Sequence, residues 1–216
     1  MRKQKTRFWD FSSMGGSGFG RWIFEPAWDP YYGPNLGFAA SAIGDRPMVV
    51  KLVEHPVDTK PEDMPALIGG CEMVSERFAE VIDRVDPGAC EFQPLTALDE
   101  RGVEIKQPAY YLLRTWREIE CVDLARSAET AEDDPRGYWI VMPVFDPSRI
   151  PADCHLFRPA EYRVTVLVSG QMKSALSKIK PSGAFIDRVW LSTDPDAPPP
   201  FWYPGYDGPQ HGVSLP

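Results

Sequence analysis

A glycine-rich run near the amino terminus is the first feature whose spacing could hold a ligand. Residues 15–20 contain four glycines. A phosphate-binding loop needs Lys and then Ser or Thr after its last glycine, because these side chains contact the phosphates and Mg²⁺. Arg21 and Trp22 occupy those positions instead. The dinucleotide fingerprint also fails, since its third glycine would fall on Arg21 and no predicted strand precedes the run. The sequence therefore predicts a flexible loop and no cofactor.

Nucleophilic catalysis needs a nucleophile, a base and a group that orients the base. The chain has three histidines, and Cys154 with His155 is its one adjacent Cys–His pair. Neighbouring side chains of an extended segment point to opposite faces, so these two would not act together. No Gly-x-Ser-x-Gly motif occurs, and no zinc-ligand spacing is present. We predict no catalytic residue and no metal ligand; an enzyme with a site around Asp153, His155 and Arg158 remains the alternative.

The charge of the chain argues against a nucleic-acid ligand. Its 23 basic and 31 acidic residues give a net charge of −8, whereas binding to phosphates needs clustered Lys and Arg. From Glu54 to Glu104 there are thirteen carboxylates and four basic residues, a local net charge of −9. Such a stretch is either a solubilising face or a surface that attracts a basic partner.

The second interpretation names candidate partner-binding residues. Carboxylates would supply charge complementarity, and aromatic side chains of a proline-rich tail would supply apolar anchors. The candidates are Asp83, Asp86, Glu91, Asp99, Glu100, Trp202, Tyr203 and Tyr206. The tail could instead pack on the body of the protein. Alternatively, the protein could be an adaptor whose tail docks into an aromatic-lined groove of another protein.

Cysteine usage and hydropathy indicate a cytoplasmic protein without a membrane span. The four cysteines are widely spaced, which is typical of small buried side chains in a reducing compartment. The longest apolar stretch, residues 138–145, is about eight residues long and contains Pro143, whereas a spanning helix needs about 20 residues. The basic residues at the amino terminus precede no apolar run of a signal peptide.

Two segments have the periodicity of amphipathic helices. In the first, Ser75 is the predicted N-cap, apolar residues follow at helical spacing from Phe78 to Val85, and residues 86–88 (Asp-Pro-Gly) end the helix. In the second, Ser169 is the N-cap, apolar residues run from Met172 to Ile179, and Pro181 ends the helix. The two match at a constant offset of 94 residues, which indicates either a duplicated helix–strand unit or a coincidence of a common pattern.

Strands are predicted over residues 47–53, 90–95, 109–113, 119–124 and 138–142. Each helix has one apolar stripe that must lie on a sheet. We therefore predict an α+β fold, with a mixed or antiparallel sheet, a few amphipathic helices packed on it, and long irregular terminal segments rich in Pro, Gly and aromatic residues. The chain 1–216 should form one domain: a loop-rich aromatic region over 1–46, an α+β core over 47–190 and a Pro/aromatic tail over 191–216.

The order of several segments resembles immunity protein family eleven of bacterial polymorphic toxin systems, first described as a domain of unknown function. The resemblance extends over about residues 74–185. The segments that carry it are Val74–Val81, Phe92–Leu95, Tyr110–Leu113, Cys121–Ser127, His155–Arg158, Val168–Ser169 and Gly183–Phe185.

This resemblance implies an α+β protein that binds a secreted toxin domain in the producing cell and silences it. It implies no catalytic residues and no cofactor. A small acidic domain with surplus aromatics suits the same function, because inhibitors of basic toxins match them with carboxylates. We therefore expect a cognate toxin domain as the partner, with no nucleic acid and no membrane; the sequence leaves the oligomeric state open.

Overall fold

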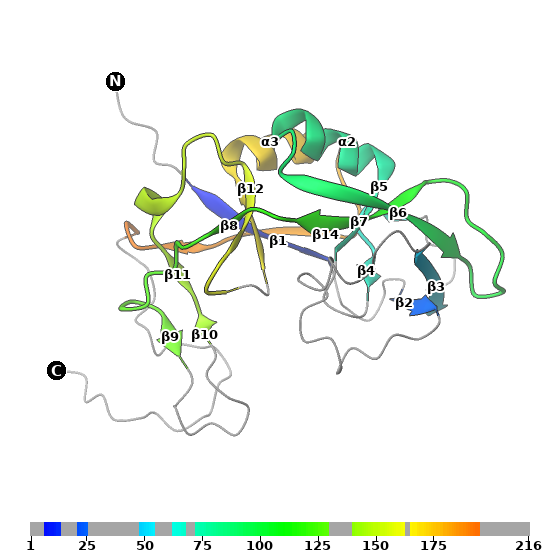
Figure 1. Cartoon of the computed structure of the whole chain (residues 1–216), viewed down its shortest axis with the longest axis horizontal. Helices are drawn as coiled ribbons and strands as arrows, with labels where there is room; N and C mark the ends of the chain where they lie inside the picture. The colour runs from blue at the N-terminus through cyan, green and yellow to red at the C-terminus, as the bar shows by residue number, and fades with distance from the viewer. Residues whose placement is uncertain are drawn as a thin grey trace.

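The computed structural model describes residues 7–13, 21–25, 48–54, 62–67, 72–129, 140–162 and 165–194. Within these ranges the fold is α+β, as predicted: two helices lie on one side of two mixed sheets (Figure 1). Within the same ranges, two pairs of short strands and a 3₁₀ turn, η1 (Pro147–Arg149), complete the structure. The pairs are β9 (Ala128–Glu129) with β10 (Ile140–Met142), and β11 (Val144–Phe145) with β15 (Trp190–Leu191).

The larger sheet has six strands. Their order is β4 (Ala66–Leu67), β2 (Arg21–Glu25), β3 (Met48–Glu54), β6 (Cys90–Leu98), β7 (Tyr110–Thr115) and β5 (Glu72–Ser75). β3 and β6 are parallel, whereas β7 is antiparallel to both of its neighbours. Three predicted strands, over 47–53, 90–95 and 109–113, are confirmed as members of this sheet.

The second sheet has five strands. Their order is β14 (Ala184–Arg188), β1 (Phe8–Ser13), β13 (Val166–Ser169), β12 (Leu156–Pro159) and β8 (Glu118–Ile119). β1 lies between β13 and β14 and is antiparallel to both. The region over 1–46, which was predicted to be rich in loops, thus supplies an inner strand of this sheet. The strand predicted over 119–124 is wrong beyond Ile119, because Leu124 to Arg126 form a turn.

Both predicted helices are confirmed, as α2 (Glu76–Val85) and α3 (Gly170–Lys178). Ser169 caps α3, because its Oγ accepts a hydrogen bond from the Met172 amide. Ser75 occupies the N-cap position of α2, but its Oγ donates to Asp63 Oδ1 at 2.8 Å instead of capping. The apolar stripes meet in one core cluster that includes Phe78, Ile82, Met172 and Leu176. The helices therefore pack together on the sheets.

The two helix–strand units have the same topology. β5 leads into α2 and β6, and β13 leads into α3 and β14. In each unit the strands before and after the helix are parallel, with one antiparallel strand between them: β7 in the first unit and β1 in the second. Both return turns contain a glycine with positive φ, Gly88 and Gly183. The sequence offset of 94 residues thus corresponds to a repeated supersecondary structure.

Candidate partner-binding surface

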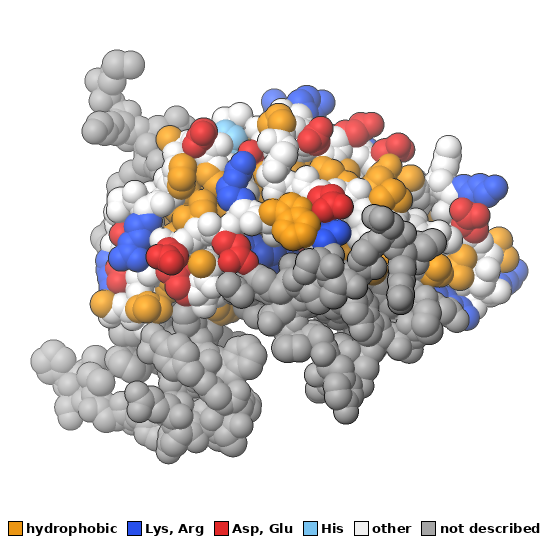
Figure 2. Space-filling model, in the orientation of Figure 1, with side chains coloured by type: hydrophobic (Ala, Val, Ile, Leu, Met, Phe, Trp, Pro, Cys, Tyr) orange, Lys and Arg blue, Asp and Glu red, His pale blue; other side chains and the backbone are white. Residues whose placement is uncertain are grey.

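The predicted acidic residues that the structure describes do not gather on one surface. Asp83 is exposed on α2, and Glu91 is exposed on β6 with its side chain directed away from the helices. Asp99 and Glu100 lie in the turn after β6, about 26 Å along that strand from Glu91. Figure 2 shows acidic side chains dispersed over the face in view and mixed with basic ones. These four carboxylates therefore do not form one patch.

Asp86 is not a surface residue, and the expectation that it is exposed is wrong. Its side chain is 6% exposed and forms an ion pair with Arg117 Nη1 at 2.6 Å. The same carboxylate oxygen accepts the amides of His155 and Leu156 at 2.8 and 3.0 Å. The hydrogen bond that Arg117 donates to this carboxylate raises the pKa of its guanidinium. Asp86 joins the end of α2 to the segment before β12, so it stabilises the fold.

Asp63, in the segment before β4, makes a comparable link to the segment that follows α3. Its backbone carbonyl accepts the Ser75 amide at 2.7 Å, as that of His155 accepts the Ser169 amide at 3.0 Å. Its carboxylate pairs with Arg77 and accepts the Ser182 amide just after α3. Burial would raise the pKa of Asp63, but hydrogen bonds from Arg77, Ser182 and Ser75 together hold it below its ordinary value. The end of α2 is thus bonded to the segment around the start of β12, and the segment after α3 is bonded to the residues that precede β4.

The three residues of the alternative enzyme site do not converge. Asp153 is exposed, whereas Arg158 is buried in β12. His155 is half-buried, and its Nδ1 lies 2.9 Å from Ser169 Oγ, the oxygen that caps α3. His155 therefore supports a helix cap. Among the described residues, no group of three or more His, Cys, Asp and Glu side chains could hold a metal ion.

The three described cysteines are free thiols in poorly hydrated surroundings. Burial raises the pKa of the Cys90 and Cys121 thiols to about 12, and it also raises the pKa of Cys154. A thiol with a raised pKa is a poor nucleophile at neutral pH, because the thiolate is the reactive form. These side chains are suited to packing. Trp202, Tyr203, Tyr206 and the glycine run lie outside the described residues.

Sequence reasoning missed an exposed stripe that consists of Trp116, Glu118 and Glu120, here called the Trp116 stripe. These three residues are exposed, whereas Arg117 and Ile119 between them are half-buried. The chain here runs from the larger sheet into β8, an edge strand of the smaller one. The sequence shows which residue types occupy positions 116 to 120. It does not show that Trp116 is exposed, because large aromatic side chains usually lie in the core.

Within the described ranges, neither α2 nor α3 has the length and apolar character that crossing a membrane requires. Among curated proteins, none matches the chain. Residues 20–189 match the model of the Immunity protein family (Imm11). Within the described ranges, that match spans both helices and the thirteen strands from β2 to β14, so it includes the repeated units that build the core. The chain belongs to the Immunity protein family (Imm11).

Proposed function

We propose that this chain binds a cognate secreted toxin domain in the cytoplasm of the producing cell and neutralises it. The observation that carries the proposal is the family match over residues 20–189. The net charge of −8 supports a basic partner, because complementary charge accelerates association. The mode of action would be binding through shape and charge, without a reaction catalysed by this chain.

The way the described core is held together suits such a binder. Buried carboxylates fix the ends of both helices, through Asp86 at the end of α2 and through Asp63, which bonds to Ser182 after α3. A surface built on packed strands and helices loses little conformational freedom when a partner binds. The protein would therefore bind without a large change of its own conformation. A few anchoring side chains would supply most of the affinity, and complementary charge would raise the association rate.

Co-expression tests this function. The partner to test is the carboxy-terminal domain of any large secreted protein encoded next to this chain, expressed with and without the chain in a sensitive host. We expect growth arrest with the toxin domain alone and restored growth with both. A catalytically inactivated toxin domain is the matched control, since it should permit growth in either case. Equally poor growth with and without this chain would contradict the proposal.

A further inference from the structure

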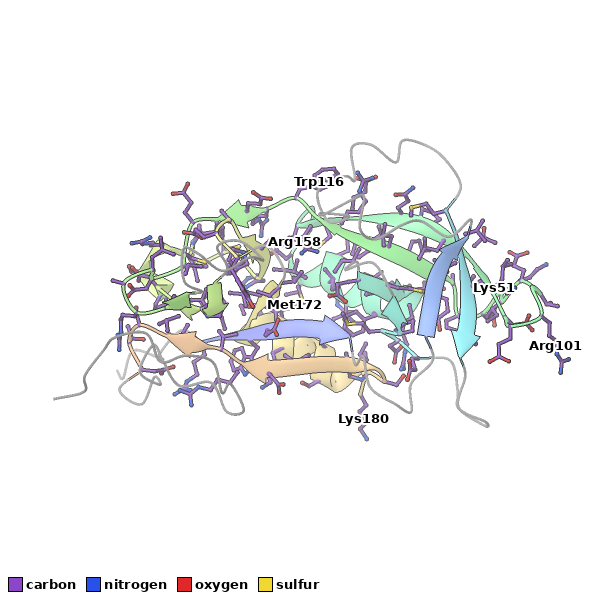
Figure 3. All side chains as sticks on the ribbon, turned by 90° about the horizontal axis from the view of Figure 1, so that it is seen from below. Lys51, Arg101, Trp116, Arg158, Met172 and Lys180 are labelled. Carbon is purple, nitrogen blue, oxygen red and sulfur yellow. The ribbon has the colours of Figure 1, made fainter. Side chains whose placement is uncertain are left out.

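Trp116 is an exposed aromatic side chain in a rigid setting. It is 53% exposed and, among the residues whose side-chain burial the structure describes, it is one of three exposed large hydrophobic residues, with Val103 and Leu124. It follows directly on β7, and the guanidinium carbon of Arg114 lies 4.6 Å from the centre of its ring. Figure 3 shows Trp116 at the outer margin of the ribbon, with Arg158 further inside. Tryptophan held in this way is the residue type most enriched among interface anchors.

The backbone of the Trp116 stripe is held in place by the contacts of Arg117 and Ile119, the residues between its members. Arg117 forms the ion pair with Asp86, and its carbonyl accepts the Arg158 amide at 2.9 Å. The Ile119 carbonyl accepts the Ala160 amide at 2.9 Å. Because Arg117 and Ile119 are held on the inner side, Trp116, Glu118 and Glu120 face outward at intervals of about 7 Å. The stripe is therefore ordered before any partner arrives.

The charges around Trp116 favour a cationic partner. Arg117 is neutralised by Asp86, and Arg114 is buried to 9% exposure beside Glu91. The Arg114–Glu91 pair is long, at 3.5 Å, and Arg114 Nε has no hydrogen-bond partner, so this pair is only weakly formed. The Glu91 side chain is half exposed. The exposed carboxylates of Glu91, Glu118 and Glu120 thus lie on the strand segments next to Trp116, whose ring has one face covered by Arg114. Glu118 is also opposite the buried Arg158 in the pairing of β8 with β12.

We propose that the Trp116 stripe, together with Glu91, is the surface on which an arginine-bearing segment of the toxin domain docks. A partner guanidinium would stack on the open face of the Trp116 ring and bond to the Glu91 carboxylate, and Glu118 and Glu120 would attract further basic side chains of the same segment. Arginine suits this site better than lysine, because its planar group both stacks on indole and binds carboxylates in a bidentate manner. This inference rests on the proposed function and assigns its binding site.

The first test measures the affinity of purified full-length variants for an inactivated toxin domain by calorimetry or surface plasmon resonance. Trp116→Ala should raise Kd about 30-fold or more, mainly through faster dissociation. Leu124→Ala, which removes a side chain of nearly equal exposure, should stay within about twofold. Trp116→Phe should give an intermediate Kd, and thermal melting confirms that each variant is folded.

The second test concerns charge and does not depend on the tryptophan. Glu118→Gln with Glu120→Gln should slow association about three- to tenfold at low salt and reduce its salt dependence. The matched control makes the same charge change in the turn after β6, with Glu100→Gln and Glu104→Gln, both exposed. That control should associate at nearly the wild-type rate.

The outcomes separate this site from the function. If wild type binds tightly and Trp116→Ala binds within twofold of it, the docking site is wrong while the immunity function stands. If the control pair at Glu100 and Glu104 slows association instead, the interface lies elsewhere. A light-scattering result in which Trp116→Ala only dissociates a homodimer would show that a second copy occupies the stripe, which contradicts the inference. Failure of wild type to bind would overturn the function and this site together.

Discussion

Two buried aspartates show how single side chains connect the halves of this molecule. Asp86 accepts two backbone amides and pairs with Arg117, whereas Asp63 pairs with Arg77 and bonds to Ser75 and Ser182. Removing one member of such a buried network destabilises the fold, because the groups that remain are then buried without a hydrogen-bond partner. Both residues therefore contribute to the stability of the fold.

Replacing Asp86 by Asn should destabilise the protein by about 2–3 kcal/mol, because Arg117 loses its counterion and the amides of residues 155 and 156 lose a charged acceptor. Asp83→Asn is the control: it makes the same chemical change on the exposed face of α2 and should change the free energy of unfolding by less than about 0.5 kcal/mol. Urea denaturation followed by circular dichroism measures both. Equal effects would contradict the assigned role of Asp86.

The lowered pKa of Asp63 makes stability depend on pH at the acid end. A carboxyl group with a lower pKa in the folded than in the unfolded state stabilises the fold above its unfolded pKa, near 3.8. That contribution is lost as the pH falls through the folded pKa. Between pH 4 and pH 2, Asp63→Asn should reduce the slope of unfolding free energy against pH by at most about 1.4 kcal/mol per pH unit, the value for one proton. Denaturation curves at several pH values give this slope; an unchanged slope would contradict the assignment.

At the scale of elements, the return from α3 into β14 depends on a glycine. Gly183 has a φ of 75°, and a Cβ there would lie 2.5 Å from the carbonyl oxygen of Met64. Gly102 has a similar φ of 80° but nothing within 4 Å of that position. Both turns disfavour a side chain for conformational reasons, but only Gly183 is also closely packed.

Gly102→Ala should therefore cost about 1 kcal/mol, from backbone strain alone. Gly183→Ala should cost about 1–3 kcal/mol more, because Met64 and its segment must shift. Unfolding free energies of the two variants, measured under the same conditions, give the difference directly. Equal destabilisation would show that the close approach to Met64 is not maintained in solution.

Local sequence pattern was sufficient for the helices but not for the partners of the strands. Ser75 and Ser169 precede apolar residues at helical spacing, and this information lies within about ten residues. The strand Phe8–Ser13 is different, because its neighbours β13 and β14 come more than 150 residues later in the chain. Pairing over such a separation leaves no mark in a local window. The same applies to Asp86, which precedes Pro87 and Gly88 as a surface turn would and is buried by residues about 70 positions away.

For the candidate site, the sequence predicts which residue types bind a partner, but it does not predict which of those residues are exposed. The sequence indicated that carboxylates and aromatics would bind a partner, but it selected Asp86, which is buried, and carboxylates that lie apart. The Trp116 stripe depends on which side of an edge strand faces outward, and the contacts of Arg117 and Ile119 with β12 and Asp86 decide this. Those contacts join segments about 30 to 40 residues apart.

At the scale of the whole molecule, two similar units are joined by reciprocal contacts. The segment before β12 bonds to the end of α2, and residues 63 and 64 bond to Ser182 after α3. The helices share one apolar core cluster with residues from both sheets. This arrangement suits a rigid binding protein; that residues 1–216 form a single domain stays a prediction.

The most direct test of the proposed function is a titration of toxin activity with this chain, using the purified toxin domain at a concentration well above the expected Kd. Inhibition by binding predicts that activity falls linearly and reaches its minimum at one equivalent of the chain per toxin domain. Inactivation of many equivalents of toxin by one equivalent of the chain would show turnover, and undiminished activity at a large excess would show that no inhibitory complex forms. Either result would contradict the account.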